Sequence, residues 1–287
     1  KRLRPLLAAA AFRAVDPGGD RSRTFALGAA LEILQSYLLI HDDWMDRDEE
    51  RRGGPSVYGV LKKGASSVHT GECLTVLAGD LASAYAFELF LRVDPGPRPA
   101  ELHRTYHRML REVIFGQHLD VLGSPDVDRV YHLKTGSYTT RGPALLGALL
   151  AGATDAQLSS IDDWATPLGI AFQLRDELLG TFGDRDSTGK PIGSDLRAGK
   201  RTKLVEIARS RLSPGDRSEL DGVLGRGDAP DEDIERMTQL IVGTGARMEV
   251  EALLRSATER SSLALTASSL DTADLAHLTQ LLVDRNH

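Results

Sequence analysis

Cysteine is scarce in this chain of 287 residues, and the chain has no excess of positive charge. Its one cysteine, Cys73, excludes an intrachain disulfide framework, favours a reducing compartment and gives no basis for a zinc site. The 35 lysines and arginines are outnumbered by 41 aspartates and glutamates, which gives a formal net charge of -6. Because binding to a nucleic acid backbone needs a basic face, this balance excludes nucleic acid as a general partner.

A long uninterrupted apolar run is also missing. A membrane-spanning helix needs ~20 mostly apolar residues, whereas Ala144 to Ala153 is short, and Glu32 and Gln35 interrupt the apolar segment that precedes Asp42. We therefore expect a soluble, cytoplasmic protein with no membrane span. Because the chain begins with Lys1 rather than methionine, we also expect further residues upstream.

Patterns typical of strands are absent as well. Apolar residues recur at helical spacing between breaks rich in proline and glycine, without the alternation of half-buried strands. With 41% hydrophobic residues, the chain can bury a sizeable core. We predict an all-α fold that forms one domain over residues 1–287, with helix ends or bends at Pro143 and Pro167.

What the chain does have is a dense acidic cluster after an apolar segment, His41-Asp42-Asp43-Trp44-Met45-Asp46. On a helix, Asp42 and Asp46 form an i, i+4 pair on one face, with Asp43 beside them. Two carboxylates at ~4 Å repel each other by about 4 kcal/mol at an effective dielectric near 20, so the cluster invites a cation. Mg²⁺ fits, because it binds one or two carboxylates, keeps waters and takes phosphate oxygens. A solvated acidic helix end is the alternative for such a cluster in isolation.

A second apolar segment ends in the same way, at Asp176-Glu177. Each acidic end is followed by basic residues: Arg51-Arg52 after the first, and a glycine-broken loop containing Lys190 and Lys200 after the second. Arginine and lysine bind phosphate groups, and glycines let the backbone approach them. Two acid-tipped helices with nearby cations favour a metal-bridged diphosphate site over two unrelated surface patches.

Over essentially its whole length, the chain resembles the polyprenyl diphosphate synthases, which are trans-prenyltransferases with the all-α isoprenoid synthase fold. The family's motifs occur in order, as Lys1 to Pro5, Asp42 to Asp46, Arg51 to Gly53, Gly116 to Asp120, Lys134-Thr135, Phe172 to Asp176 and the lysine loop. The resemblance implies a helical bundle around a central cavity. It also implies that the enzyme condenses isopentenyl diphosphate with an allylic diphosphate, whose ionisation is assisted by Mg²⁺.

The resemblance further implies which residues bind metal. The direct Mg²⁺ ligands are expected to be Asp42, Asp46 and Asp176, with about three ions when substrates are bound. Supporting positions are expected at Asp43, Glu177 and Asp120. A helix cap or an ion pair is the alternative role of Asp120.

Substrate contacts are implied in the same way. The allylic diphosphate is expected to contact Arg51, Lys134, Lys190 and Lys200. The carbocation is expected to lie beside Thr135 and Gln173. Isopentenyl diphosphate is expected to contact Lys1, Arg4, Gln35 and Arg52. The proton released after coupling goes to the departing diphosphate, so no protein nucleophile is needed.

Product length is expected to depend on Tyr37 and Leu38. Tyr37 precedes Asp42 by about 7.5 Å along a helix axis, and a helical wheel places Leu38 more nearly below Asp42. The resemblance points to Tyr37, because a single aromatic residue there accompanies a geranylgeranyl diphosphate product. We predict that product, with farnesyl diphosphate as the alternative; an ordinary core position is the alternative role of Tyr37.

The second acidic motif departs from the family pattern at Glu177 and Gly180, where aspartates are usual. Asp176, the usual metal ligand, is retained, so we expect activity to persist.

Two other functions use this fold. A class I terpene cyclase would need a second motif with Asn, Ser and Glu at helical spacing, and a non-catalytic subunit should lack an aspartate cluster; neither pattern is found. The resemblance to the family also implies that the protein forms a homodimer.

Overall fold

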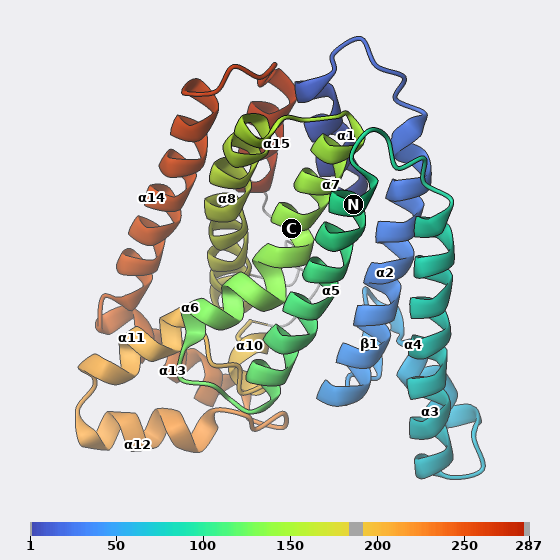
Figure 1. The fold of residues 1–287 in the computed structure, drawn as a ribbon. Coiled ribbons are helices and arrows are strands. Elements are labelled where there is room, and N and C mark those ends of the chain that lie inside the picture. The colour runs from blue at the N-terminus through green and yellow to red at the C-terminus, as the bar shows by residue number, and fades with distance from the viewer. Residues whose placement is uncertain (1, 184–191, 284–287) are drawn as a thin grey trace. The chain divides into compact units, whose positions relative to one another are not determined.

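The computed structural model describes residues 2–183 and 192–283, which form helices joined mostly by short turns (Figure 1). Apart from one small hairpin, the regular structure in these residues is helical, which confirms the predicted all-α class. The chain divides into two compact units. The first comprises the described parts of Lys1–His107, Gly142–Ile161 and Ser269–Asp271, and the second comprises those of Arg108–Arg141, Asp162–Ser268 and Thr272–His287. The single domain expected from the sequence remains a prediction.

The first unit is built on two long helices, α2 (Arg23–Asp46) and α4 (Val68–Leu91), which pack along each other (Figure 1). Alanine-rich α1 (Leu3–Val15) packs against α2 and against α7 (Gly142–Leu150). Its small side chains allow close helix packing, and its larger residues Leu7 and Phe12 are fully buried.

A tight hairpin and a short helix connect α2 to α4. Strands β1 (Glu50–Arg51) and β2 (Gly54–Pro55) pair antiparallel and lead into α3 (Val57–Gly64). At the turn, Arg52 and Gly53 have φ values of 56° and 78°. Two successive positive φ values are the geometry of a type I′ hairpin turn, which favours glycine at its second position. The turn sends β2 back along β1.

The second unit contains most of the remaining helices. They are α5 (Pro99–Val121) from Arg108 onward, α6 (Val127–Val130), η1 (Tyr131–Arg141), α8 (Asp155–Phe182) from Asp162 onward, α10 (Ser194–Arg197), α11 (Lys203–Arg211), α12 (Pro214–Val223), α13 (Asp231–Gly243), α14 (Ala246–Thr266) and α15 (Ala273–Val283). Its apolar core joins η1, α8, α11, α13 and α14 through residues such as Tyr131, Leu174, Leu204, Met237 and Val250.

The element η1 is a π-helix of 11 residues, a rare form that the sequence did not predict. It ends at Arg141, and Pro143 is the second residue of the next helix, α7. The helical run is continuous from α6 through η1 into α7, so Pro143 lies within it and removes one backbone N–H donor there. The helix type changes beside Pro143, whereas α8 continues through Pro167, and the bends expected at these two prolines remain a prediction.

Helices α2 and α4 are long and apolar enough to cross a membrane by length and composition alone. Their most apolar windows have mean hydropathies of 1.3 and 1.4, and 33% and 22% of those windows are buried. Core helices of water-soluble proteins meet the same test, and α2 carries three aspartates in its last turns. The expected absence of a membrane span therefore remains a prediction.

Candidate functional site

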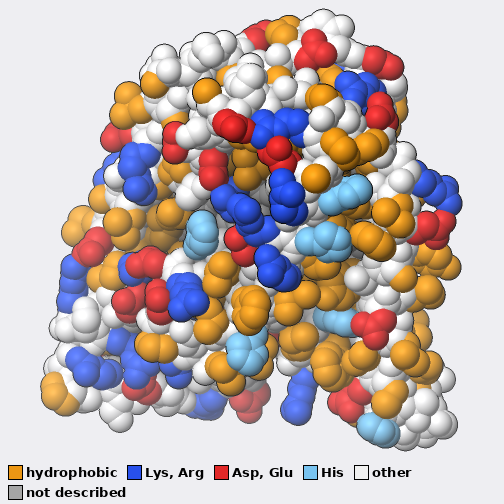
Figure 2. Space-filling view, viewed as in Figure 1, with side chains coloured by type: hydrophobic (Ala, Val, Ile, Leu, Met, Phe, Trp, Pro, Cys, Tyr) orange, Lys and Arg blue, Asp and Glu red, His pale blue; other side chains and the backbone are white. Residues whose placement is uncertain are grey.

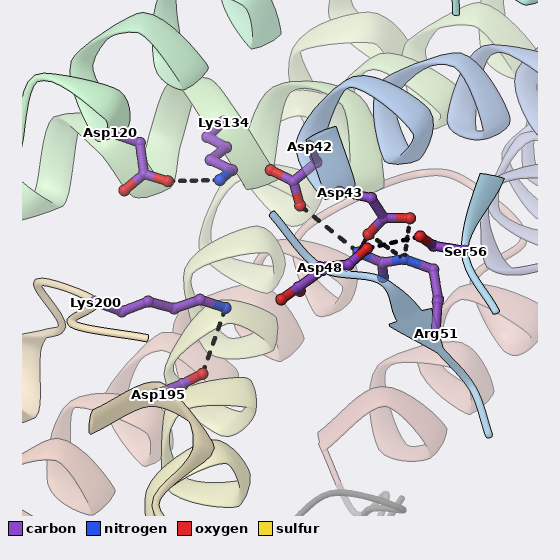
Figure 3. A network of polar contacts seen from close by, with 9 residues as sticks. All are labelled: Asp42, Asp43, Asp48, Arg51, Ser56, Asp120, Lys134, Asp195 and Lys200. Carbon is purple, nitrogen blue, oxygen red and sulfur yellow. Dashed lines mark hydrogen bonds and ion pairs between the residues drawn. The ribbon is translucent and has the colours of Figure 1, made fainter. Parts of the chain in front are cut away.

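The first acidic cluster lies at the carboxyl end of α2, as predicted (Figure 3). Asp42 and Asp46 are one turn apart; the Asp42 side chain is 25% exposed and Asp46 is exposed. Asp43 is different, because its side chain is buried against Arg51. The cluster thus has two acids near solvent and one buried acid.

Arg51 is held at the end of α2 by this buried acid. Its Nε donates to both carboxylate oxygens of Asp43, at 2.7 and 2.9 Å, and its Nη2 also contacts Asp43 Oδ1. The same Nη2 lies 3.9 Å from Asp42 Oδ2. Burial raises the pKa of Asp43 despite the opposing effect of the guanidinium. Burial also acts to lower the pKa of Arg51, but the hydrogen bonds and charge of Asp43 outweigh it and raise that pKa, so the guanidinium stays charged.

The hairpin that carries Arg51 is fastened on both sides. Ser56 Oγ donates to Asp48 O at 2.6 Å and accepts from Gly59 N at 3.0 Å, which caps α3. Ser56 N–H donates to Glu49 O at 2.8 Å. These bonds join the backbone before β1 to the backbone after β2, and they limit the movement of Arg51.

Tyr37, the expected determinant of product length, faces α4. Its ring is half-buried and meets the His41 ring edge-on, with 5.0 Å between the centroids. The His41 Nε2 atom lies 3.0 Å from Val76 O and 3.8 Å from Asp80 Oδ1, both on α4. Burial and the charge of Asp80 raise the pKa of Tyr37. Leu38 is partly buried.

The residues expected to contact isopentenyl diphosphate are spread over the first unit. Arg4 is buried in the first turn of α1, Gln35 is partly buried on α2, and Arg52 is exposed in the hairpin turn. Lys1 lies outside the described residues. Their shared role therefore remains a prediction.

In the second unit, three motifs that are distant in sequence meet. Gly116 lets α5 approach η1, because a Cβ atom there would lie 2.2 Å from Lys134 N. Lys134 Nζ forms an ion pair with Asp120 Oδ2 at 2.5 Å (Figure 3). Thr135 Oγ1 donates to Gln173 Oε1 at 2.6 Å. Packing thus brings α5, η1 and α8 together. Asp120 forms an ion pair, which is one of the alternatives to a supporting role in metal binding.

At the end of α8, the two neighbouring acids have different surroundings. Asp176 is partly buried, whereas Glu177 is 1% exposed. Glu177 Oε2 accepts from Lys203 N at 3.1 Å, and the Leu204 N–H also donates to this carboxylate. Burial raises the pKa of Glu177 well above its usual range; the charge of Asp195 adds to this effect, and the two backbone N–H groups oppose it.

The unusual Gly180 has a steric explanation. A Cβ atom at this position would lie 2.2 Å from Asp195 Oδ2. The space that an aspartate would occupy at position 180 is therefore filled by the Asp195 side chain. Asp195 also lies 3.4 Å from Lys200 Nζ (Figure 3), and Lys200 is 47% exposed. Lys190 lies outside the described residues.

Within residues 2–183 and 192–283, no three His, Cys, Asp or Glu side chains form a group able to hold a metal ion. Asp43 is engaged by Arg51, and Asp176 belongs to a different compact unit from Asp42 and Asp46. The carboxylate donors at the end of α2 do fit Mg²⁺, which needs only one or two carboxylates besides waters and phosphate oxygens. A metal site made from all three aspartates remains a prediction.

Comparison with known proteins decides the family. A sequence model described as polyprenyl synthetase matches residues 1–241. This chain belongs to the polyprenyl synthetase family. It is therefore a trans-prenyltransferase with the all-α isoprenoid synthase fold, an enzyme that transfers prenyl groups. The substrates of the family are isopentenyl and allylic diphosphates, and the family generally uses Mg²⁺.

Relatives of this polyprenyl synthetase are named for products of different length. It is 33% identical over 251 residues to a geranylgeranyl diphosphate synthase of Saccharolobus solfataricus, covering 84% of this chain and 72% of that protein. The chain is also 33% identical over 296 residues to a geranylfarnesyl diphosphate synthase of Aeropyrum pernix. The match covers 99% of this chain and 88% of that protein. Family membership therefore leaves the product open.

A solved structure is similar over nearly the whole chain. It is geranylgeranyl pyrophosphate synthase from Corynebacterium glutamicum, complexed with isoprenyl diphosphate and magnesium. Its sequence is 34% identical, the TM-score is 0.92, and the alignment covers 99% of this chain and 86% of that chain.

Sequence reasoning missed the contacts that two residues make beside the expected site residues, Tyr131 and Asp195. The Tyr131 hydroxyl accepts from Lys203 N at 2.8 Å, and Asp195 fills the space beside Gly180. A signal for Asp195 was present, since it is an acid within a basic, glycine-broken loop. No signal distinguished Tyr131 from an ordinary core aromatic residue.

Proposed function

We propose that this enzyme elongates an allylic diphosphate with isopentenyl diphosphate in a Mg²⁺-dependent reaction, and that its main product is geranylgeranyl diphosphate. The observation that carries the proposal is the end of α2, where Asp42 lies 3.9 Å from the guanidinium of Arg51 and one turn from Asp46. Carboxylate oxygens can hold a divalent ion, and an adjacent fixed guanidinium can bind the phosphate oxygens that the ion shares.

Asp42 and Asp46, together with Asp176, would hold Mg²⁺. When bound, the metal supplies Lewis-acid neutralisation of the diphosphate leaving group. Arg51 would bind the same group, and because Asp43 already fixes its position, little ordering is needed on binding. Lys134, Lys200 and Lys190 would add positive charge that stabilises the leaving group as its carbon–oxygen bond breaks.

Thr135 and Gln173 are suited to the neighbourhood of a carbocation. The hydroxyl proton of Thr135 is directed to Gln173 Oε1, so the remaining lone pairs of the hydroxyl oxygen can face positive charge. Neither residue would act as a nucleophile. The double bond of isopentenyl diphosphate would attack the cation, and the released proton would pass to the departing diphosphate. Arg4, Gln35, Arg52 and Lys1 would bind isopentenyl diphosphate.

The product length is proposed from Tyr37. Its half-buried ring meets the His41 ring at a centroid distance of 5.0 Å, and His41 in turn contacts Val76 O and Asp80 on α4. A braced aromatic ring near the aspartates is suited to block a growing prenyl chain. Farnesyl diphosphate is the alternative product. Whether the wild type makes geranylgeranyl or farnesyl diphosphate, Tyr37→Ala is expected to give a longer prenyl chain.

One assay tests the proposal. The protein is incubated with isopentenyl diphosphate, each allylic primer in turn and Mg²⁺ or EDTA, and the products are sized after phosphatase treatment. We expect linear geranylgeraniol with Mg²⁺ and no product with EDTA. Farnesol as the end product would overturn the proposed length, cyclic hydrocarbons would indicate a cyclase, and the absence of product would indicate a non-catalytic subunit.

We also propose that two copies associate. Exposed apolar side chains follow one face of α4, at Leu74, Leu77 and Leu81, and Figure 2 shows hydrophobic side chains over this region. Their spacing of three and four residues keeps them on a single stripe. Light scattering after gel filtration is expected to give a dimer mass for the wild type and a smaller mass for Leu77→Glu. A monomeric wild type would contradict this proposal.

A further inference from the structure

The segment that carries Lys200 is fastened to the second unit at several points. Arg201 Nη1 donates to Gly123 O at 2.5 Å, and Thr202 N–H donates to Lys200 O at 3.1 Å. Lys203 Nζ pairs with Asp128 at 3.0 Å. These contacts leave the backbone of residues 199–203 little freedom.

The start of α11 has backbone donors that need partners from outside the helix. The first N–H groups of any helix have no acceptor within it. Thr202 Oγ1 accepts from Val205 N at 3.2 Å, as an N-cap residue does. The Lys203 N–H is shared by the Tyr131 hydroxyl and Glu177 Oε2, at 2.8 and 3.1 Å, and the Leu204 N–H donates to Glu177. Glu177 thus caps α11 from another helix.

Burial restricts what else Glu177 can do. The side chain is 1% exposed, and its Oε1 has no hydrogen-bond partner among the residues that the structure describes. The oxygen that does have partners, Oε2, is turned to the start of α11. The positive end of the α11 dipole further favours an acceptor at this place. The neighbouring Asp176 is less buried and is the residue of this pair suited to bind a hydrated ion.

We propose that Glu177 is a positioning residue, which caps α11 and thereby fixes the loop of Lys200, and that it does not bind metal. The inference rests on the proposed role of Lys200 as a diphosphate ligand. Lys200 precedes the capped Lys203 N–H by three residues, so loosening the start of α11 would also loosen the Lys200 backbone. Capping of α11 requires a side-chain oxygen at position 177 that accepts hydrogen bonds, and it does not require a negative charge there.

The test compares Glu177→Ala, Glu177→Gln, Tyr131→Phe and Asp176→Asn in the full-length protein. Glutamine keeps an acceptor oxygen and removes the charge, whereas alanine removes both. Tyr131→Phe weakens the same cap without altering an acid. Hydrogen exchange of the Lys203 and Leu204 amides is measured without substrate, and KM for the allylic diphosphate and the Mg²⁺ dependence of activity are measured with it.

We expect amide exchange at Lys203 and Leu204 to be about tenfold faster in Glu177→Ala, as for a lost helix cap. KM should rise about tenfold, with a smaller change in kcat. Tyr131→Phe should shift exchange and KM in the same direction by a few fold. In Glu177→Gln, amide exchange at Lys203 and Leu204 and the Mg²⁺ dependence of activity should both stay within about twofold of wild type. Asp176→Asn should alter the Mg²⁺ dependence and leave exchange unchanged.

Two results would overturn the inference. One is a Glu177→Gln protein whose Mg²⁺ dependence is as impaired as that of Asp176→Asn, because a metal ligand needs the charge. The other is unchanged amide exchange at Lys203 and Leu204 in Glu177→Ala. Amide exchange does not depend on activity, so failure of the proposed function, a wild type that makes no product, is distinguishable from failure of this inference.

Discussion

Near the ends of α2 and α8, a buried carboxylate is satisfied by different kinds of partner. Each presents two neighbouring acids, Asp42-Asp43 and Asp176-Glu177, and in each pair the second acid is buried while the first is nearer the surface. Asp43 is satisfied by the guanidinium of Arg51, whereas Glu177 is satisfied by backbone N–H groups of α11. The buried acid of each pair holds the following basic segment in place.

The difference follows from what comes next in the chain. After α2, which ends at a left-handed C-cap, Arg47, strand β1 places the Arg51 side chain beside the helix end, so the buried acid meets a charged partner. After α8 and the short helix α10, the start of α11 lies against the buried acid, so this acid meets backbone donors that have no acceptor within α11. An aspartate-rich motif can therefore contain both acids near the surface and buried acids that hold neighbouring segments.

The first prediction tests whether the less buried acid of each pair, Asp42 and Asp176, contributes to one metal site. Asp42→Asn and Asp176→Asn are each expected to lower kcat by on the order of 10²-fold, because charge stabilisation of the leaving group is lost. If both bind the same group of ions, the double variant should be far less impaired than the product of the single effects.

The measurement is the rate of radiolabelled product formation. Glu50→Gln is the control, since Glu50 is an exposed acid in the same region. Multiplicative effects in the double variant would mean that the two aspartates act independently.

The second prediction concerns the buried pair at α2. Asp43→Ala leaves the guanidinium of Arg51, 28% exposed, without its bidentate partner. The free energy of unfolding should fall by about 3 kcal/mol, as for other buried pairs from which one member is removed. Urea unfolding monitored by circular dichroism measures the change. Arg52→Ala, at an exposed position of the same turn, should stay within about 0.5 kcal/mol of wild type; an equal effect in both variants would contradict the role of Asp43.

The third prediction addresses backbone packing in the second unit. Gly116→Ala places a Cβ atom where it would be 2.2 Å from Lys134 N, so α5 and η1 must separate. We expect a loss of about 1–3 kcal/mol in unfolding free energy and a lower affinity for the allylic diphosphate. Gly222→Ala in α12 is the matched control, because nothing lies within 4 Å of the added atom. That variant should be as stable as wild type or slightly more stable; a stable Gly116→Ala protein would mean that η1 is not held this closely.

The smallest effect is expected at a more exposed pair, Arg141 and Asp162, whose atoms are 2.6 and 2.9 Å apart. Burial acts to raise the pKa of Asp162, but the hydrogen bonds and charge of Arg141 outweigh it and lower that pKa. A carboxyl with a lowered pKa in the folded state stabilises the fold above its unfolded pKa of ~3.9 and loses this contribution as the pH falls through the folded value.

Asp162→Asn should therefore cost about 1 kcal/mol at pH 7, a value kept small by solvent screening. The difference in melting temperature between this variant and wild type should narrow as the pH falls from about 5 to about 3. A difference that is constant over this range would show that the charge of Asp162 contributes nothing.

Local pattern was enough to determine several features of this protein. The all-α class, the helix that carries Asp42 and Asp46, the i, i+4 relation of these two residues and the order of the motifs all depend on residues close together in the chain, so the sequence contains them directly. The family follows from the same motifs.

Only the tertiary structure decided which acids are buried and what satisfies them. Neighbouring acids look alike in a sequence, but Asp43 meets the side chain of Arg51 on β1, and Glu177 meets the start of α11. The contact of Gly116 with Lys134 is likewise a product of packing. Burial and hydrogen-bond partners depend on segments far apart in the chain, and these are brought together only when the helices pack.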